Sequence, residues 1–165
     1  MKPHPAKIAI RPMTPADVEW AKDLSDASPG APHWSGKAYL AATDPDAKPG
    51  RIALVAEVAK IASEARSFRA RMGLIVASYV SPEAELEIVL VAPAARRHGV
   101  ARQLFTALAA GLKLASVTEV TLEVRASNRP ALALYTSLGF RESGLRPRYY
   151  ADPVEDAILM RSKLG

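Results

Sequence analysis

Hydrophobic and polar positions along the chain follow two periods, and each period predicts one kind of element. Apolar runs of about four to eight residues predict strands, whereas apolar residues spaced three and four apart predict amphipathic helices. These patterns place strands at residues 7–11, 51–58, 73–80, 85–91, 117–124, 148–150 and 157–161, and helices at residues 14–28, 35–42, 97–112 and 128–138. The predicted order is therefore β-α-α-β-β-β-α-β-α-β-β.

The predicted helices carry capping signals at their ends. Thr14 is a candidate N-cap followed by Pro15 at the first helical position, and Ser35 is a candidate N-cap for the second helix. Gly139 ends the last helix, since glycine readily adopts the left-handed conformation found there. Residues 59–72 are charged and alanine-rich, and their pattern fits a long hairpin loop, strand extensions or a short helix equally well.

The order of elements indicates the fold class. Three consecutive strands before the first long helix argue against a doubly wound Rossmann-type sheet. We expect an α/β (α+β) fold with a mixed, largely antiparallel central sheet of six to seven strands and helices on both faces. A length of 165 residues is typical of one domain, so residues 1–165 are expected to form a single domain.

Composition excludes several kinds of chemistry. The chain has no cysteine, which excludes disulfides, thiolate nucleophiles and cysteine-ligated metals. Its three histidines are not spaced for a shared metal ion, so no metal is expected. The net charge is +5, but an aromatic content of 6% offers little for base stacking, and direct nucleic-acid binding is not expected. No apolar run approaches the ~20 residues that span a bilayer, and the N-terminus lacks a signal-peptide pattern, so we expect a cytoplasmic protein without membrane contact.

One segment combines a strand end, small residues and a helix start. It consists of Val89, Leu90 and Val91 at the strand end and of Arg96, Arg97, His98, Gly99, Val100, Ala101 and Arg102 at the helix start. Free N–H groups and the helix dipole at such a start favour an anion, and Gly99 and Ala101 leave the backbone open to a phosphate. The segment lacks both the Walker A pattern and the dinucleotide glycine spacing. The alternative is a solvated basic helix start with a small residue for packing.

Two blocks of sequence resemble a known family. The R-x-x-G-x-A pattern that begins at Arg96 resembles the acyl-coenzyme A signature of the GNAT superfamily. The strings L-E-V-R-A-S-N at 122–128, A-L-Y at 133–135 and L-G-F at 138–140 are similar to those of bacterial ribosomal-protein-alanine N-acetyltransferases within that superfamily. Weaker matches lie at residues 33–35, 148–150 and 155–157. The resemblance covers roughly residues 8–160.

The resemblance implies an acetyl-CoA-dependent N-acetyltransferase and assigns roles to particular residues. Glu123 would accept the proton of the amine, and Tyr135 would donate a proton or a hydrogen bond to the departing thiolate. The backbone of Leu90 and Val91 would polarise the thioester carbonyl, and Asn128 would contact the coenzyme. The implied acceptor is the N-terminal α-amine of a protein, in particular a ribosomal protein. The enzyme itself is expected to be a monomer or a weak dimer.

Each of these roles has a structural alternative. Glu123 also fits a surface carboxylate on an amphipathic strand, and Tyr135 fits a core aromatic on the inner face of a helix. Asn128 also fits a helix N-cap, a role compatible with coenzyme contact. Glu85 and Glu87 are alternative bases, because superfamily members differ in where that residue lies.

The sequence departs from the family pattern in two places. Residues 59–72 are longer than the corresponding hairpin, and Ile88 stands where an asparagine is often found. Both positions are expected near the acceptor. A small-molecule amine or lysine acetyltransferase is therefore an alternative function, and a non-catalytic acyl-coenzyme A sensor is an alternative of another class.

Overall fold

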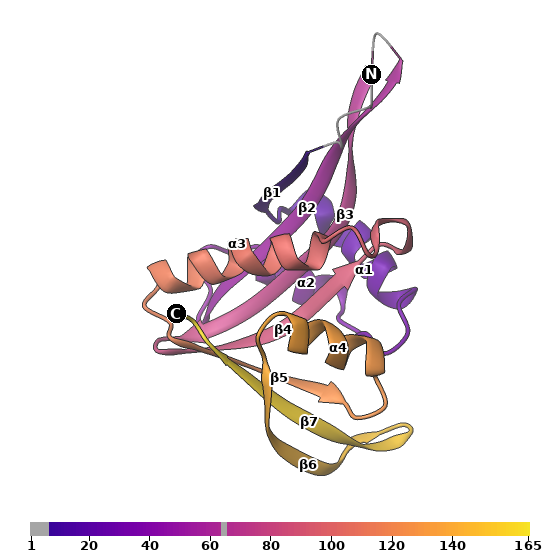
Figure 1. Cartoon of the computed structure of the whole chain (residues 1–165). Helices are drawn as coiled ribbons and strands as arrows, with labels where there is room; N and C mark the ends of the chain where they lie inside the picture. The colour runs from indigo at the N-terminus through magenta and orange to yellow at the C-terminus, as the bar shows by residue number, and fades with distance from the viewer. Residues whose placement is uncertain (1–6, 64–65) are drawn as a thin grey trace.

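The computed structural model of the chain describes residues 7–63 and 66–165, and its centre is one seven-stranded sheet (Figure 1). The strands lie in the order β1-β2-β3-β4-β5-β7-β6. They are β1 (Ile8–Pro12), β2 (Gly50–Ser63), β3 (Arg66–Val80), β4 (Glu83–Val91), β5 (Glu119–Arg125), β6 (Arg141–Ala151) and β7 (Val154–Lys163). Neighbouring strands are antiparallel except β4 and β5, which are parallel. The mixed, largely antiparallel sheet that the sequence predicts is confirmed.

Within the described residues, four α-helices connect and cover the strands. They are α1 (Val18–Asp26), α2 (Gly36–Ala42), α3 (Val100–Leu114) and α4 (Arg129–Ser137), with 3-10 turns η1 (Pro15–Asp17) and η2 (Pro93–Ala95). The predicted order of elements is confirmed, as is the cap of α2, where the Ser35 Oγ accepts a hydrogen bond from the Ala38 N–H at 3.1 Å. Helix α3 begins three residues later than predicted, because Arg97 and Gly99 have φ values of 63° and 74° that a right-handed helix does not allow.

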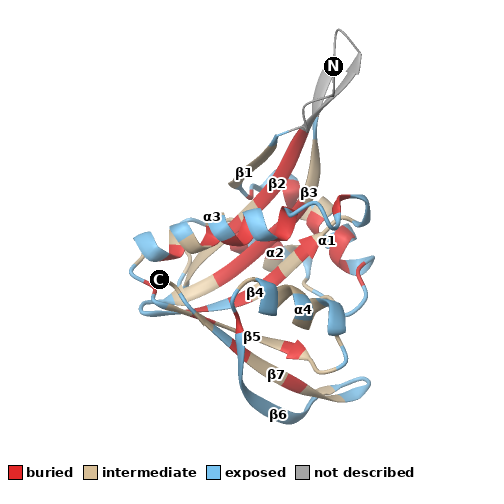
Figure 2. Cartoon of the chain, in the orientation of Figure 1, coloured by how far each residue is buried: buried red, intermediate tan, exposed pale blue. Residues whose placement is uncertain are grey.

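The two sheet faces carry separate apolar clusters, and β3 shows how its sequence serves both. Leu74 and Val76 pack with α1 and α2, whereas Ile75 and Ala77 pack with α3 on the opposite face. Successive strand residues point to opposite faces, so a continuous apolar run is required where both faces are covered. Figure 2 shows the resulting band of buried residues along β2, β3 and α3. Helices on both faces are thus confirmed.

The segment at residues 59–72 forms strand extensions, one of the three conformations that its pattern allows. Strands β2 and β3 stay paired from Ala59 opposite Arg69 to Ser63 opposite Arg66. In Figure 1 this pair reaches well beyond the rest of the sheet. Residues 64 and 65 lie outside the described residues.

Strand β6 is longer than the sequence predicts. It runs from Arg141 to Ala151, whereas only residues 148–150 were expected to be extended. Nearly all of its residues are exposed, because β6 is an edge strand of the sheet. An edge strand exposed on both faces has no alternation of apolar and polar residues to reveal it.

A buried carboxylate and the arginines that pair with it join the start of α1 to the sheet. The Asp17 carboxylate is fully buried and accepts hydrogen bonds from Arg11 at 2.8 and 2.9 Å, from Arg71 at 2.7 Å and from the Thr14 N–H at 2.9 Å. Burial acts to raise the pKa of Asp17, but these hydrogen bonds and charges outweigh it and hold the pKa well below its ordinary value. Asp17 therefore stays ionised and ties three segments of the chain together.

Candidate active site

The site begins where two neighbouring strands part. Strands β4 and β5 pair only through Glu83 with Glu119, Ala84 with Val120, and Glu85 with Thr121. Past these pairs, β4 continues beside β3 and β5 continues beside β7. The two strands therefore diverge in a V shape. Beyond Glu85, the edge of β4 that is not paired with β3 lies along the gap between the strands.

A β-bulge lies at the point where the strands part. On β3 the consecutive residues Val76 and Ala77 face Ile88 and Leu86 of β4, so Glu87 is an extra residue in β4. A bulge bends its strand and redirects the residues that follow. Here those residues are the last of β4, which contains the segment predicted to polarise a carbonyl.

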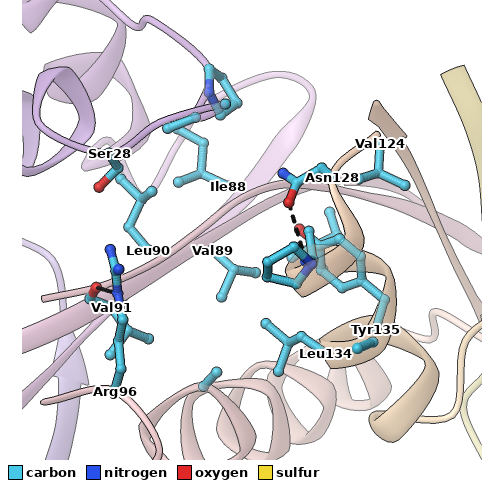
Figure 3. Close-up of a pocket in the computed structure, with 18 of the residues that line it drawn as sticks. Ser28, Ile88, Val89, Leu90, Val91, Arg96, Val124, Asn128, Leu134 and Tyr135 are labelled. Atoms are coloured by element: carbon cyan, nitrogen blue, oxygen red, sulfur yellow. Dashed lines mark hydrogen bonds between the residues drawn. The ribbon is translucent and has the colours of Figure 1, made fainter. Parts of the chain in front are cut away.

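The gap between β4 and β5 leads into a cavity of about 1010 Å³, shown in Figure 3. Its walls come from β4, the start of α3, the end of β5, α4 and the α1–α2 connection. The predicted site residues that line it are Val89, Leu90, Val91, Arg96, Arg97, Gly99, Val100, Ala101, Arg102, Glu123, Asn128 and Tyr135. One wall is thus made of the predicted coenzyme segment and another of the two predicted proton-transfer residues.

The start of α3 presents its backbone to the cavity. Gly99 is the N-cap of α3, and no side chain caps the first turn. A Cβ placed on Gly99 would meet nothing within 4 Å, so the space beside it is open. Such a helix start offers free N–H groups and a partial positive charge to an anion.

Two arginines and a histidine of this segment make contacts within the protein. The Arg96 Nε donates to the Val91 carbonyl at 3.2 Å, and Arg102 donates to the Ser137 carbonyl of α4 at 3.2 Å. Arg102 thereby ties the start of α3 to the end of α4. His98 is exposed, its Nδ1 lies 2.7 Å from the Arg96 carbonyl, and it does not line the cavity, so the predicted coenzyme contact of His98 stays a prediction.

Tyr135 lines the cavity from the wall formed by α4 (Figure 3). Its ring packs edge-on against Phe140 with the centroids 5.9 Å apart. Burial, with a smaller contribution from Tyr150, raises the pKa of Tyr135 to about 12. The hydroxyl is therefore protonated near neutral pH and able to donate a proton or a hydrogen bond.

Glu123 projects from β5 on the face opposite the buried residues Val120, Leu122 and Val124. This alternation is the one that the sequence predicts. Its side chain is 20% exposed, lines the cavity and lies 3.3 Å from the Nε of Arg146. The carboxylate thus reaches both the interior of the cavity and its outer edge.

The two alternative bases lie in different surroundings. Glu87 forms an ion pair with Arg51, whose Nε is 3.3 Å from the carboxylate. The pKa of Glu85 is raised by partial burial and then by the negative charges of Glu123 and Glu87, while Arg146 lowers it. Glu85 and Glu123 therefore act on each other electrostatically across the gap.

Asn128 combines the two roles that the sequence leaves open. Its Oδ1 accepts a hydrogen bond from the Ala131 N–H at 3.2 Å, so it caps α4, and it also lines the cavity. Its Nδ2 lies 3.3 Å from the position of a Cβ on Gly30. The α1–α2 connection therefore approaches the start of α4 across the cavity.

Several site residues were not predicted from the sequence. They belong to the α1–α2 connection at residues 28–32, to α4 (Pro130, Ala133 and Leu134) and to β6 (Tyr150, with Arg146 and Tyr149 beside it). Leu134 faces the cavity (Figure 3), whereas Leu132 packs against the hydrophobic core. Helix α4 has nine residues, and its apolar side chains are shared between the core and the cavity.

Arg125 has a structural role in the site. Its guanidinium lies 4.1 Å from the ring centroid of Tyr150 and 3.4 Å from the Glu155 carboxylate. Both contacts hold the β6–β7 hairpin beside the end of β5. The cation–π contact also positions Tyr150, which lines the cavity.

Two features are absent from the part of the chain that the structure describes. Over residues 7–63 and 66–165, no three His, Asp or Glu side chains gather in a way that could hold a metal ion. Within the same residues, no helix is long and apolar enough to cross a membrane.

Comparison with known proteins links this geometry to one family. Residues 37–140 match the family model described as Acetyltransferase (GNAT) family. The [Ribosomal protein bS18]-alanine N-acetyltransferase of Escherichia coli is 44% identical over 87 residues, which are 52% of this chain and 59% of that protein. The N-alpha-acetyltransferase RimI of Mycobacterium tuberculosis is 43% identical over 83 residues, 50% of this chain and 51% of that protein. The matched part of the chain thus spans little more than half the length of these relatives.

Solved structures match over nearly the whole chain. The crystal structure of the ribosomal-protein-S18-alanine N-acetyltransferase from Escherichia coli superposes with a TM-score of 0.75 at 28% identity, covering 96% of this chain and 95% of that one. Naa20 from Chaetomium thermophilum, crystallised with a bisubstrate analogue, superposes with a TM-score of 0.75 at 26% identity, covering 94% and 86%.

Proposed function

The chain belongs to the acetyltransferase (GNAT) family, and we propose that it transfers an acetyl group from acetyl-CoA to the N-terminal α-amine of a protein. The observation that carries this proposal is the parting of β4 and β5 after Glu85, which opens one cavity onto both a free helix start and the Glu123 carboxylate. The relatives named for bS18 alanine acetylation favour a ribosomal protein as the acceptor. In this proposal residues 1–165 act as one cytoplasmic domain.

The residues present fit acetyl-CoA. The uncapped first turn of α3 and the open space at Gly99 suit the pyrophosphate, and Arg96 and Arg97 add positive charge beside them. The cavity volume of about 1010 Å³ is ample for an extended coenzyme arm between β4 and α4. When bound, acetyl-CoA supplies a thioester whose carbonyl carbon accepts the amine.

Glu123 is the proposed proton acceptor. A protonated amine is not nucleophilic, so its proton must leave before or during attack. Glu123 lines the cavity and retains access to its outer edge, which lets it take the proton directly or through one water. A positioned general base contributes about 10²- to 10⁴-fold to a rate.

Tyr135 is the proposed proton donor to the thiolate. Because burial keeps its pKa near 12, the hydroxyl carries its proton throughout the neutral range. The Tyr135 ring packs against Phe140, and the side chain lines the cavity. The Tyr135 hydroxyl can therefore donate a proton without first having to gain one.

The end of β4 is proposed to polarise the carbonyl. Leu90 and Val91 line the cavity, and the β5-facing edge of their strand has no register partner on β5 in the described structure. A backbone N–H that is preorganised toward developing negative charge is worth about 3 kcal/mol. The V-shaped gap thus supplies both the space and the donor.

Two other functions make different predictions for one assay. In the small-molecule or lysine acetyltransferase, the extended β2–β3 pair would shape a different acceptor site. In the acyl-coenzyme A sensor, acetyl-CoA would raise the melting temperature without turnover. Coenzyme release is measured with peptides that have a free N-terminus and no lysine, with N-terminally blocked peptides that contain a lysine, and with polyamines and aminoglycosides. We expect release only with free peptide N-termini; turnover confined to another class, or binding without turnover, contradicts the proposal.

A further inference from the structure

Arg146 covers the proposed base from the solvent side. Its Nε lies 3.3 Å from Oε1 of Glu123, and its guanidinium lies 5.5 Å from the ring centroid of Tyr149. The Arg146 side chain is 54% exposed, whereas that of Glu123 is 20% exposed. Glu123 lines the cavity and Arg146 does not, so Arg146 stands at the outer rim.

Arg146 is the positively charged side chain that interacts with both Glu123 and Glu85 at this rim. Glu87 is occupied by Arg51, which leaves Glu85 and Glu123 as the two carboxylates near the guanidinium. The charge of Arg146 lowers the pKa of Glu85 against the opposing effects of burial and of Glu123. A cationic amine that approaches this rim therefore meets two carboxylates and one guanidinium, and the carboxylates attract it.

Binding of the acceptor exchanges one ion pair for another. An α-ammonium that pairs with Glu123 would compete with the Arg146 guanidinium for the carboxylate. The guanidinium would then have a weaker contact with its closest carboxylate at the outer rim. An acceptor with a carboxylate of its own beside the amine would satisfy Arg146 at the same time, through a charge-assisted pair.

We propose that Arg146 is a specificity-determining residue that selects protein N-termini with Asp or Glu at the second or third position. An extended chain rises about 3.3 Å per residue, so these positions fall at the rim when the first residue is at Glu123. The Arg146 side chain is about half exposed and lies outside the cavity lining, so it is accessible to an acceptor whose amine is bound at Glu123. The inference rests on the proposed function and deepens it by naming the acceptor class.

The test compares three peptides that differ only at the second residue, which is Asp, Asn or Lys. We measure kcat/KM with the natural chain and with Arg146→Gln, Arg146→Glu and Arg141→Gln. Arg141 is the matched control, since it is an exposed arginine at the far end of the same strand. An ion pair at an exposed rim is worth up to about 1 kcal/mol, so we expect about fivefold preference for Asp over Asn.

The expected pattern has three parts. The natural chain and Arg141→Gln prefer Asp over Asn and Asn over Lys, Arg146→Gln accepts Asp and Asn equally, and Arg146→Glu prefers Lys. Equal ranking of the peptides by the natural chain and Arg146→Gln overturns the inference, even if all are acetylated. If the natural chain acetylates no peptide, the proposed function fails and the inference falls with it.

Discussion

Glu85 and Thr121 form the last register pair between β4 and β5, and every group assigned to the reaction lies past this pair. Two residues further along β5 is Glu123, and two residues further along β4 is the bulged Glu87. A continuous ladder would have used the edge of β4 to hold β5. Because the pairing stops after Glu85, the end of β4 is free to form a wall of the cavity.

Replacing the Tyr135 hydroxyl should slow transfer by a factor that does not depend on pH. Because the pKa of Tyr135 is raised to about 12, its proton is retained at all pH values from 7 to 10. We expect Tyr135→Phe to lower kcat by about 10²-fold or more, with the affinity for acetyl-CoA little changed. Rates are measured across this pH range for both proteins. An alkaline loss of activity with a pKa near 10 that is absent from Tyr135→Phe would show that the hydroxyl ionises at its ordinary pKa.

A side chain at Gly99 should cost more in coenzyme affinity than in stability. Gly99 has a φ of 74°, so alanine there is strained by about 1 kcal/mol, but its Cβ meets no protein atom within 4 Å. We expect Gly99→Ala to bind acetyl-CoA about tenfold more weakly, equivalent to 1.4 kcal/mol, because the methyl group enters the proposed pyrophosphate space. Calorimetric titration with acetyl-CoA gives the affinity.

The control for this change is Gly139→Ala. Gly139 has a φ of 94° and lies outside the cavity lining, so alanine brings a similar backbone strain without entering the cavity. We expect its affinity for acetyl-CoA to equal that of the natural chain. Equal weakening by both substitutions would mean that backbone strain, and not contact with the coenzyme, sets the effect.

Removing the charge of Asp17 should destabilise the fold. Hydrogen bonds to a charged group are worth about 1.5–3 kcal/mol, so we expect Asp17→Asn to lower the free energy of unfolding by about this amount at neutral pH. Because the pKa of Asp17 is depressed in the folded state, its contribution is fully present above the ordinary value near 4 and is lost as the pH falls further. Urea unfolding at several pH values measures the difference, which should shrink on acidification.

Asp26→Asn is the control for this prediction. Asp26 forms a pair with Lys22 at 2.6 Å, but both side chains are 47% exposed. Exposed pairs contribute little to stability, so unfolding should change little at any pH. A difference between Asp17→Asn and the natural chain that stays constant down to pH 2 would contradict the assigned ionisation of Asp17.

Much of the fold could be predicted because its elements are buried on a regular period. The apolar runs of β2, β3 and β4 and the amphipathic face of α3 appear directly in the sequence. The full length of β6 could not be predicted, since an exposed edge strand lacks that period. The start of α3 was predicted too early because the positive φ of Arg97 is set by the turn around it, and arginine does not signal that conformation.

The site divides in the same way between local and long-range features. Gly99, Glu123 and Tyr135 lie in local motifs and were predicted from them. Arg146 was not, because it reaches Glu123 only through the pairing of β6 with β7 and of β7 with β5. The residues next to Arg146 in the sequence give no signal of a contact that depends on the pairing of distant strands.

The most direct test of the account locates the acetyl group on the product. The natural chain and Glu123→Gln are incubated with acetyl-CoA and a peptide with a free N-terminus, and fragmentation mass spectrometry identifies the modified nitrogen. We predict that the natural chain acetylates the α-amine and that Glu123→Gln does so about 10²- to 10⁴-fold more slowly, with its affinity for acetyl-CoA retained. Acetylation of another nitrogen, or an undiminished rate with Glu123→Gln near neutral pH, would contradict the account.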